Sequence, residues 1–297
     1  MSDGSPANMR LVMGRRAATL LLLLTALFLS GCSYFLSSAT SGMTDDLTAA
    51  VLDQDDPAIV RDGAPAYLIA LDGMIEGDPR NERLLLAGAR LYGAYAGAFV
   101  DDPERASRLT LRARRYGERA LCERNRPLCE AVPGSYDDFV GLLAETDTEE
   151  LPALYGLGSA WAGWVQANAS DWNAIADLPK LQALMERIVA LDDGYEDGGA
   201  HLYLGVLYTL RPASLGGKPE LGRQHFERAI EISQGRNLMA KVLFASQYAR
   251  LVFDRPLHDR LLGEVVDADP HARGFTLVNA LAQEEAALLL AGGDDYF

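Results

Sequence analysis

The residues of this 297-residue chain that are best suited to chemistry are three cysteines, four histidines and two pairs of adjacent acids. No two of the histidines stand four residues apart beside a third ligand, so the sequence predicts no metal site. His225 lies near the apolar seam of an expected helix, where we predict a hydrogen-bonded packing histidine. The four histidines are His201, His225, His258 and His271.

The paired acids have a structural interpretation that competes with acid–base catalysis. Asp101-Asp102 and Glu149-Glu150 stand where helices are expected to begin, and acids there interact favourably with the positive end of the helix dipole. The sequence contains no nucleophile elbow, phosphate-binding loop or dinucleotide fingerprint. We therefore predict no catalytic residue, no cofactor and no enzymatic activity.

Cys32 ends an N-terminal segment whose sequence is typical of a targeting signal. Arg15-Arg16 precede the apolar run 17–29, which is too short to span a bilayer comfortably and is typical of a signal peptide. The following Ser30-Gly31-Cys32 resembles the lipobox of bacterial lipoproteins, in which the cysteine is diacylated and becomes the first residue. We expect a signal peptide at 1–31, lipidation of Cys32 and a flexible tether at 32–46. The alternative is a plain signal peptide with an incidental cysteine.

The predicted lipoprotein signal also predicts where in the cell the protein lies. The chain would lie on the periplasmic side of a bacterial envelope, held to the membrane by its lipid. Ser33, rather than Asp, follows the cysteine, and by resemblance to proteobacterial lipoproteins this permits sorting to the outer membrane. In that oxidising compartment Cys122 and Cys129 are either a disulfide around a small loop or two free buried thiols.

The charge balance excludes one class of partner. The full chain carries 42 acids and 27 bases, a net charge of -15, which argues against nucleic-acid binding because phosphate recognition needs clustered bases. Cleavage before Cys32 would remove Asp3 and three arginines, leaving 41 acids and 24 bases. An anionic body is not attracted to anionic lipid, so acyl chains rather than the protein surface would hold it.

The body that positions these residues is predicted to be all-α. Apolar residues recur with helical spacing, as in the series from Leu181 to Val189 and from Leu238 to Val252, and no alternating stretch long enough for a strand is found. We expect one helical-repeat domain over 47–297. Leu91-Tyr92 and Leu207-Tyr208 match at an offset of 116, which predicts an internal duplication with copies at about 65–117 and 179–233.

The second copy resembles the helical hairpin of a tetratricopeptide repeat. Leu204-Gly205 and Tyr208 match the first-helix signature, and Gly222, Phe226 and Ala229 match the second. The small residues would let two helices approach, while the aromatic ring fills the groove. Stacked hairpins of this kind form a solenoid with a concave face.

Three groups of residues are candidates for binding. Trp161 and Trp164 share one helix face and, with Tyr203 and Tyr248, either line an apolar ligand cleft or are core aromatics between hairpins. An elongated loop at 211–220 either recognises a partner or caps a neighbouring hairpin. Arg250, Asp254 and Asn279 are expected to form a buried polar network, with ligand contact as the alternative. The recognition residues in the loop are Ser214, Gly216, Gly217 and Lys218.

Across nearly all of the body the chain resembles the T-component (TatT) family of TRAP transporters. The resemblance rests on structural repeat positions. They are 92–106, Ser214 to Glu220, Phe226, Ala229, Gly235 to Asn237, Tyr248 to Arg250, Asp254-Arg255, Leu261-Leu262, Asn279-Ala280 and Tyr296-Phe297.

The resemblance implies a periplasmic, tetratricopeptide-like lipoprotein that forms homo-oligomers. It also implies association with the substrate-binding P-component of a TRAP transporter and a cleft for a hydrophobic organic acid or another apolar molecule. The alternative function is an envelope-assembly scaffold that binds peptides or outer-membrane machinery. An enzyme on an α-superhelix, such as a murein-cleaving lipoprotein, is disfavoured because no segment with a suitably placed Glu is found.

Overall fold

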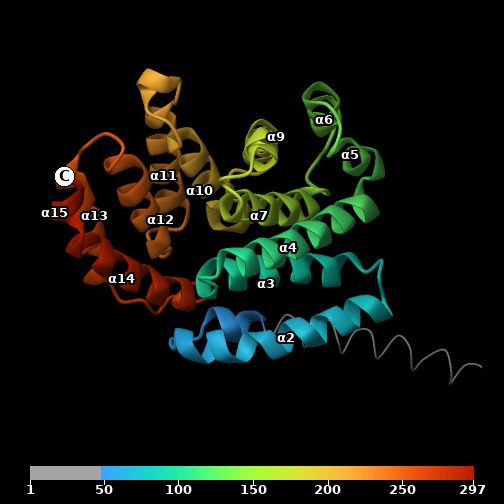
Figure 1. Cartoon of the computed structure of the whole chain (residues 1–297), viewed down its shortest axis with the longest axis horizontal. Helices are drawn as coiled ribbons and strands as arrows, with labels where there is room; N and C mark the ends of the chain where they lie inside the picture. Colours follow the sequence, from blue (N-terminus) through green and yellow to red (C-terminus); the bar gives the residue numbers. More distant parts are fainter. Residues whose placement is uncertain (1–47) are drawn as a thin grey trace, which may run out of the picture. The chain divides into compact units, whose positions relative to one another are not determined.

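The computed structural model describes residues 48–297 (Figure 1). The chain divides into two units, Met1–Val51 and Leu52–Phe297, and of the first only residues 48–51 are described, as helix. Within the described residues the fold is helical and contains no strand, so the all-α prediction is confirmed. The predictions for the signal peptide, Cys32, Ser33 and the tether lie outside the described residues. None of the helices in 48–297 is long and apolar enough to cross a membrane.

The first half of the larger unit is built on four long helices. They are α2 (Pro57–Gly77), α3 (Glu82–Phe99), α4 (Pro103–Arg124) and α7 (Leu151–Ala167). Each of α2, α3 and α4 packs against the next, and α7 lies across both α3 and α4 (Figure 1). Two short helices, α5 (Arg126–Ala131) and α6 (Tyr136–Leu143), connect α4 to α7.

The second half begins with α8 (Trp172–Ala176), α9 (Leu178–Leu191) and α10 (Tyr195–Thr209). Because α9 packs on both α7 and α10, one hydrophobic core extends from the end of α4 through α5, α6, α7 and α9 to α10. A 3-10 turn, Ala213–Leu215, then leads to α11 (Pro219–Ile232), which packs against α10.

The C-terminal helices form a second core around α12 (Leu238–Leu243) and the π-helix η2 (Phe244–Ala249). Helix α13 (Arg255–Val266) packs on η2, and α14 (Thr276–Ala291) packs on α12 and α13. The short α15 (Gly293–Tyr296) ends the chain.

Helix starts follow local side-chain chemistry. The Asp102 carboxylate accepts a hydrogen bond from the Arg105 N–H at the start of α4, and the Asp254 carboxylate accepts one from the Leu257 N–H at the start of α13. A proline follows in the first turn of each helix, where its missing N–H costs nothing. Of the paired acids, Asp102 is therefore a helix cap. Glu150 accepts hydrogen bonds from the Asp147 N–H and the Asn125 amide just before α7.

The hairpin of α10 and α11 depends on two glycines. A Cβ atom at Gly205 would lie 2.6 Å from the Phe226 ring, and one at Gly222 would lie 2.6 Å from Thr209 Cγ2 and 2.9 Å from the Gly205 carbonyl oxygen. Phe226 is fully buried between the helices. The small residues thus permit the close approach that the sequence motif predicts, and the aromatic ring fills the groove.

The two predicted repeat copies each cover three helices. Residues 65–117 contain most of α2, all of α3 and most of α4, whereas 179–233 contains all but the first residue of α9 and all of α10 and α11. Whether these segments are copies of one unit stays a prediction.

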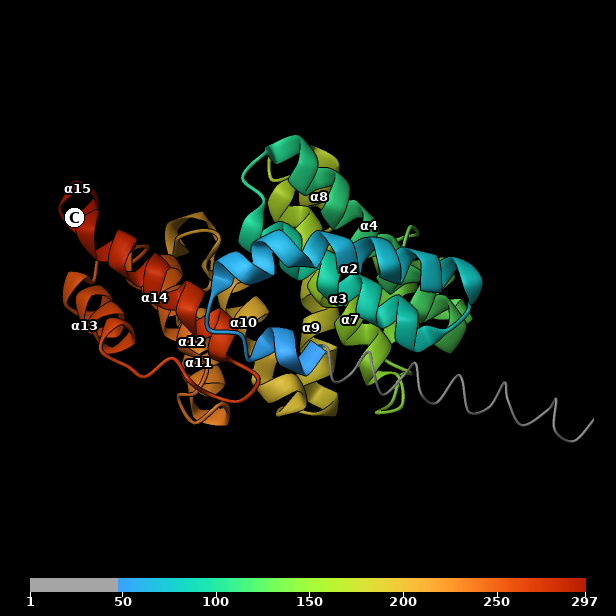
Figure 2. The ribbon, with the colours of Figure 1, turned by 90° about the horizontal axis from the view of Figure 1, so that it is seen from below.

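The beginning and the end of the larger unit touch. The Gly274 N–H donates a hydrogen bond to the Asp53 carboxylate, and His271 Nε2 lies 3.7 Å from an Asp55 carboxylate oxygen. Helix α14 also contacts α2 (Figure 2). The first and last long helices therefore have each other as neighbours.

Candidate functional site

Three tyrosines from two helices form a compact cluster. The Tyr155 ring on α7 lies edge-on to the rings of Tyr195 and Tyr203 on α10, with centroids 5.6 and 6.3 Å apart. Tyr155 also packs on the backbone of Gly199, because a Cβ atom there would lie 2.1 Å from its hydroxyl oxygen. Edge-to-face packing of this kind fixes the rings without filling their hydrogen-bonding capacity.

The hydroxyls of Tyr155 and Tyr203 are free to donate a hydrogen bond. Neither has a hydrogen-bond partner among residues 48–297, yet neither belongs to the fully buried atoms without a partner, so both retain contact with accessible space. Burial raises the pKa of Tyr203 to about 12 and raises the pKa of Tyr155 well above its ordinary value. Both phenols therefore stay neutral at physiological pH and can donate to an acceptor on a ligand.

An ion pair stands beside this cluster. The Arg90 guanidinium of α3 binds the Glu196 carboxylate, and both charges act on Tyr155 and Tyr203. Glu196 belongs to a left-handed turn at the start of α10, where Glu196, Asp197 and Gly198 have φ values of 50°, 53° and 78°. Asp197 is paired with Arg236 at 2.9 Å, so both non-glycine residues of this strained turn are held by arginines.

Trp161 and Trp164 share one cation but differ in accessibility. The Arg114 guanidinium lies 4.7 Å from the centre of the Trp161 ring and 4.4 Å from that of Trp164. Trp161 is fully buried, and its indole N–H donates to Asp177 at 3.0 Å. Trp164 is half-buried. Trp161 is thus a core side chain that holds α4, α7 and the start of α9 together.

Tyr248 lies in the other core. Its hydroxyl donates to Glu220 at 2.7 Å, its ring packs on Phe244, and burial raises its pKa to about 12. Of the four residues predicted to share a ligand cleft, Trp161, Trp164 and Tyr203 belong to one hydrophobic core and Tyr248 belongs to the other.

The predicted recognition loop is a tight structure on the surface. Ser214, Gly216 and Lys218 are exposed, and Gly216 has a φ of 79°. At Gly217 a Cβ atom would lie only 1.7 Å from the Arg211 carbonyl oxygen, so this position accepts only glycine. The Lys218 N–H donates to the Tyr208 carbonyl, which ties the loop to the end of α10.

Arg250, Asp254 and Asn279 do not form one network. Asn279 is buried and accepts from the Leu238 N–H, while its amide donates to the carbonyls of Arg236 and Pro270. Asp254 caps α13, and Arg250 stacks on Tyr296 at 4.6 Å. Of these three residues, only Asn279 joins α14 to the turn that precedes α12.

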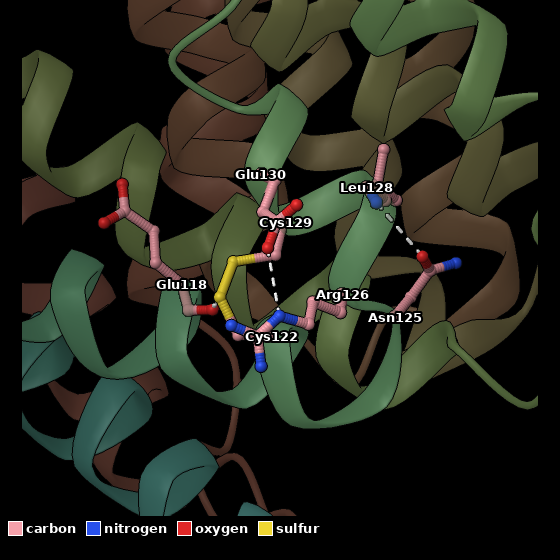
Figure 3. Close-up of a disulfide and its surroundings, with 7 residues drawn as sticks. All are labelled: Glu118, Cys122, Asn125, Arg126, Leu128, Cys129 and Glu130. Carbon is pink, nitrogen blue, oxygen red and sulfur yellow. Dashed lines mark hydrogen bonds and ion pairs between the residues drawn. A yellow bond between two sulfur atoms is a disulfide. The ribbon is translucent and has the colours of Figure 1, made fainter.

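Cys122 and Cys129 are joined by a disulfide (Figure 3). Their Cα atoms are 5.0 Å apart, and the bond ties the end of α4 to α5. Between them Asn125 ends α4 and also starts α5, because its side chain accepts from the Leu128 N–H.

A polar surface hollow of about 410 Å³ lies at the C-terminal end of α7. Its walls come from the first turns of α4 and from the segment after α7. They are Pro103, Glu104, Ser107, Arg108, Ala167, Asn168, Ser170 and Asp171. None of the residues predicted to bind a ligand lines it. Within residues 48–297 no group of His, Cys, Asp and Glu side chains is arranged to hold a metal ion.

Sequence reasoning missed Tyr155, Tyr195 and Arg90, which complete the cluster around Tyr203. No local motif marks them, because they come from three helices that meet only in the folded chain. The one available signal was the proximity of Tyr155 to Trp161 on the same apolar helix.

Comparison with known proteins gives two matches. The family model described as TRAP transporter T-component matches residues 53–297. An uncharacterized protein of Treponema pallidum (strain Nichols) is 27% identical over 278 residues, which cover 85% of this chain and 84% of that protein. The family match spans every long helix described above.

Proposed function

Because this chain belongs to the TRAP transporter T-component family, we propose that it is a lipid-anchored accessory protein that docks the substrate-binding P-component of a TRAP transporter and holds a hydrophobic ligand. The observation that carries the proposal is the family match over 53–297. The family is a transporter component and not a family of enzymes.

The ligand is assigned to the tyrosine cluster. Tyr155 and Tyr203 present neutral, unpartnered hydroxyls in surroundings that are strongly desolvated. Binding sites for apolar molecules are largely apolar and carry a few placed polar groups. An apolar molecule with a carbonyl or carboxylate oxygen matches that pattern, because phenol hydroxyls donate to such oxygens.

The remaining parts of the proposal come from the sequence. Cys32 carries the lipid on the periplasmic side of the envelope, Ser33 permits the outer membrane, and copies of the chain associate with one another. The close glycine contacts of α10 and α11 support tetratricopeptide-like packing.

The docking half of the proposal is tested by co-purification. The full-length lipoprotein is extracted from membranes with detergent, and the P-component of the same organism is sought by mass spectrometry and then titrated in purified form. We expect a saturable complex. Absence of binding with both proteins folded would refute docking.

The ligand half is tested by native mass spectrometry of the purified protein followed by solvent extraction. We expect a co-purified apolar molecule whose occupancy falls in the Tyr155→Phe and Tyr203→Phe variants, because each loses one hydroxyl donor. Tyr136→Phe is the matched control, since Tyr136 is an exposed tyrosine on α6. Equal occupancy in all variants would remove the assignment to this cluster.

A further inference from the structure

At the C-terminal end of the chain, several aromatic rings pack against one another in series. Phe253 stacks on Tyr296 with centroids 6.1 Å apart, and Tyr296 lies edge-on to Phe297 at 5.2 Å. Phe297 in turn covers the buried His258, and the Arg250 guanidinium packs on the Tyr296 ring. Figure 1 shows α15, which carries Tyr296, beside α13.

The backbone conformation of Phe253 is energetically unfavourable for a phenylalanine. Its φ is 56°, a left-handed conformation that is unfavourable for a bulky side chain and that glycine or asparagine adopts readily. Its side chain is 72% exposed, so little apolar burial offsets this cost. The helix cap explains the left-handed backbone of Phe253, but it does not explain a phenylalanine where glycine is usual. Left-handed non-glycine residues cluster at functional sites.

The π-helix determines where this surface points. In η2 the chain inserts an extra residue per turn, as shown by the Arg250 N–H donating to the Ala245 carbonyl five residues back. At the end of this helix the Asp254 N–H donates to the Ala249 carbonyl and the Phe253 N–H donates to the Arg250 carbonyl, which is the bond pair of a Schellman C-cap with Phe253 as its left-handed residue. Residues after the π-turn are therefore rotated relative to an ordinary α-helix, and π-turns are frequent at functional sites.

Arg250 leaves a charge unmatched on this surface. Among the described residues its guanidinium makes no ion pair or hydrogen bond, and its Nε is buried without a partner. Neighbouring Arg255, by contrast, is neutralised by Asp259 and Asp294. In a protein with a net charge of -15, an arginine without a carboxylate is complementary to an acidic group on another molecule.

We propose that Phe253, Tyr296 and Arg250 form the surface that docks the P-component, with the Phe253 ring entering an apolar recess of that protein and Arg250 binding a carboxylate at the rim of the recess. This inference rests on the proposed function and specifies the contact. Aromatic rings and arginines are the residues that most often dominate the binding energy of protein interfaces.

The experiment compares variants of the full lipoprotein in titrations with the purified P-component. Phe253→Asn keeps the left-handed backbone and removes the ring, so we expect an equal or higher melting temperature and an affinity at least tenfold weaker. Arg250→Met keeps the stacking on Tyr296 and removes the charge. We expect it to weaken binding and to flatten the dependence of affinity on salt concentration.

Trp172→Asn is the matched control, because Trp172 is 82% exposed and lies in another part of the fold. We expect it to bind as the wild type does. Wild-type affinity in Phe253→Asn, or loss of affinity only in Trp172→Asn, would overturn the assignment of this surface while docking itself stands. Failure of the wild type to bind the P-component would instead refute the proposed function.

Discussion

At the scale of single residues, the side chains of Asp193, His201 and His225 connect the segment before α10 with α10 itself and with α11. The Asp193 carboxylate lies 2.8 Å from His201 Nε2, and the two Nδ1 atoms of His201 and His225 are 2.7 Å apart. Arg228, and to a lesser extent His201, lowers the pKa of Asp193. Burial, followed by the neighbouring His201, lowers the pKa of His225 to about 4.

The lowered pKa of His225 makes the free energy of unfolding depend on pH. Between pH 6.5 and about 4 the unfolded chain binds a proton at His225 that the folded chain does not, so the free energy of unfolding falls as the pH falls through this window. Because His225 is only half-buried, we expect its share to be at most about 2 kcal/mol. Urea titrations at several pH values measure it.

The same titrations on His225→Phe should show a shallower loss of stability over that window, because phenylalanine retains the stacking on Tyr208 and cannot bind a proton. His271→Asn is the control, since Asp269 raises the pKa of the exposed His271. Its folded form holds a proton more tightly, which gives a contribution of the opposite sign. An unchanged slope in His225→Phe would contradict the assignment.

Asn279 gives a second prediction at this scale. Asn279→Ala leaves the Leu238 N–H and the carbonyls of Arg236 and Pro270 without their side-chain partner in the interior. We expect a loss of about 3 kcal/mol in unfolding free energy. The exposed Asn173, changed to Ala, should cost less than about 0.5 kcal/mol. Similar losses in the two variants would show that Asn279 is not a structural bridge.

At the scale of elements, the hairpin of α10 and α11 was foreseeable because its motif is local. The spacing of Gly205, Gly222 and Phe226 within two adjacent helices encodes the close approach directly. The π-helix was not predictable, because the series from Leu238 to Val252 has ordinary helical spacing and nothing in that spacing marks the extra residue in η2.

Gly205→Val tests the hairpin. The added side chain would overlap the Phe226 ring, and we expect a destabilisation of about 2–3 kcal/mol measured by urea unfolding. Gly263→Ala on α13 is the opposite case, because nothing lies within 4 Å of its added Cβ atom. It should stabilise by about 0.5–1 kcal/mol. Equal effects of the two changes would mean that α10 and α11 are not in close contact.

The disulfide between α4 and α5 gives the other prediction at this scale. It closes a short loop, since Cys122 and Cys129 are seven positions apart. The entropy of the unfolded chain then predicts that the pair of changes Cys122→Ala and Cys129→Ala costs about 2.5 kcal/mol. Mass spectrometry after alkylation without reductant checks the bond itself. Two alkylated cysteines in the native protein would contradict it.

At the scale of the whole molecule, the helical class and many helix starts were predictable from periodicity and capping residues. The cluster around Tyr155 was not predictable, because Arg90, Tyr155 and Tyr203 carry no local motif and come together only where α3, α7 and α10 meet. For Trp161 the sequence left a cleft position and a core position open, because it does not show that Arg114 packs on the ring or that Asp177 accepts from the indole N–H.

The acidic charge of the body predicts how it behaves near lipid. A chain that begins at Ser33 lacks the cysteine expected to carry the lipid. We expect this chain to remain in the supernatant when vesicles containing anionic lipid are sedimented at physiological salt, because its charges repel the surface. The acylated full-length lipoprotein should sediment with the same vesicles. Sedimentation of both would indicate that the protein surface itself binds membranes.

The contact of Asp53 with Gly274 joins positions 221 residues apart. In an open array of stacked helices each unit touches only its neighbours, so folding can start anywhere and the ends fray independently. Here α2 gains its last neighbour only after α14 has been synthesised and folded. Such a long-range closure is entropically slow. The N-terminal helices therefore keep one side uncovered until the C-terminal helices fold, and a chaperone would protect that side during this interval.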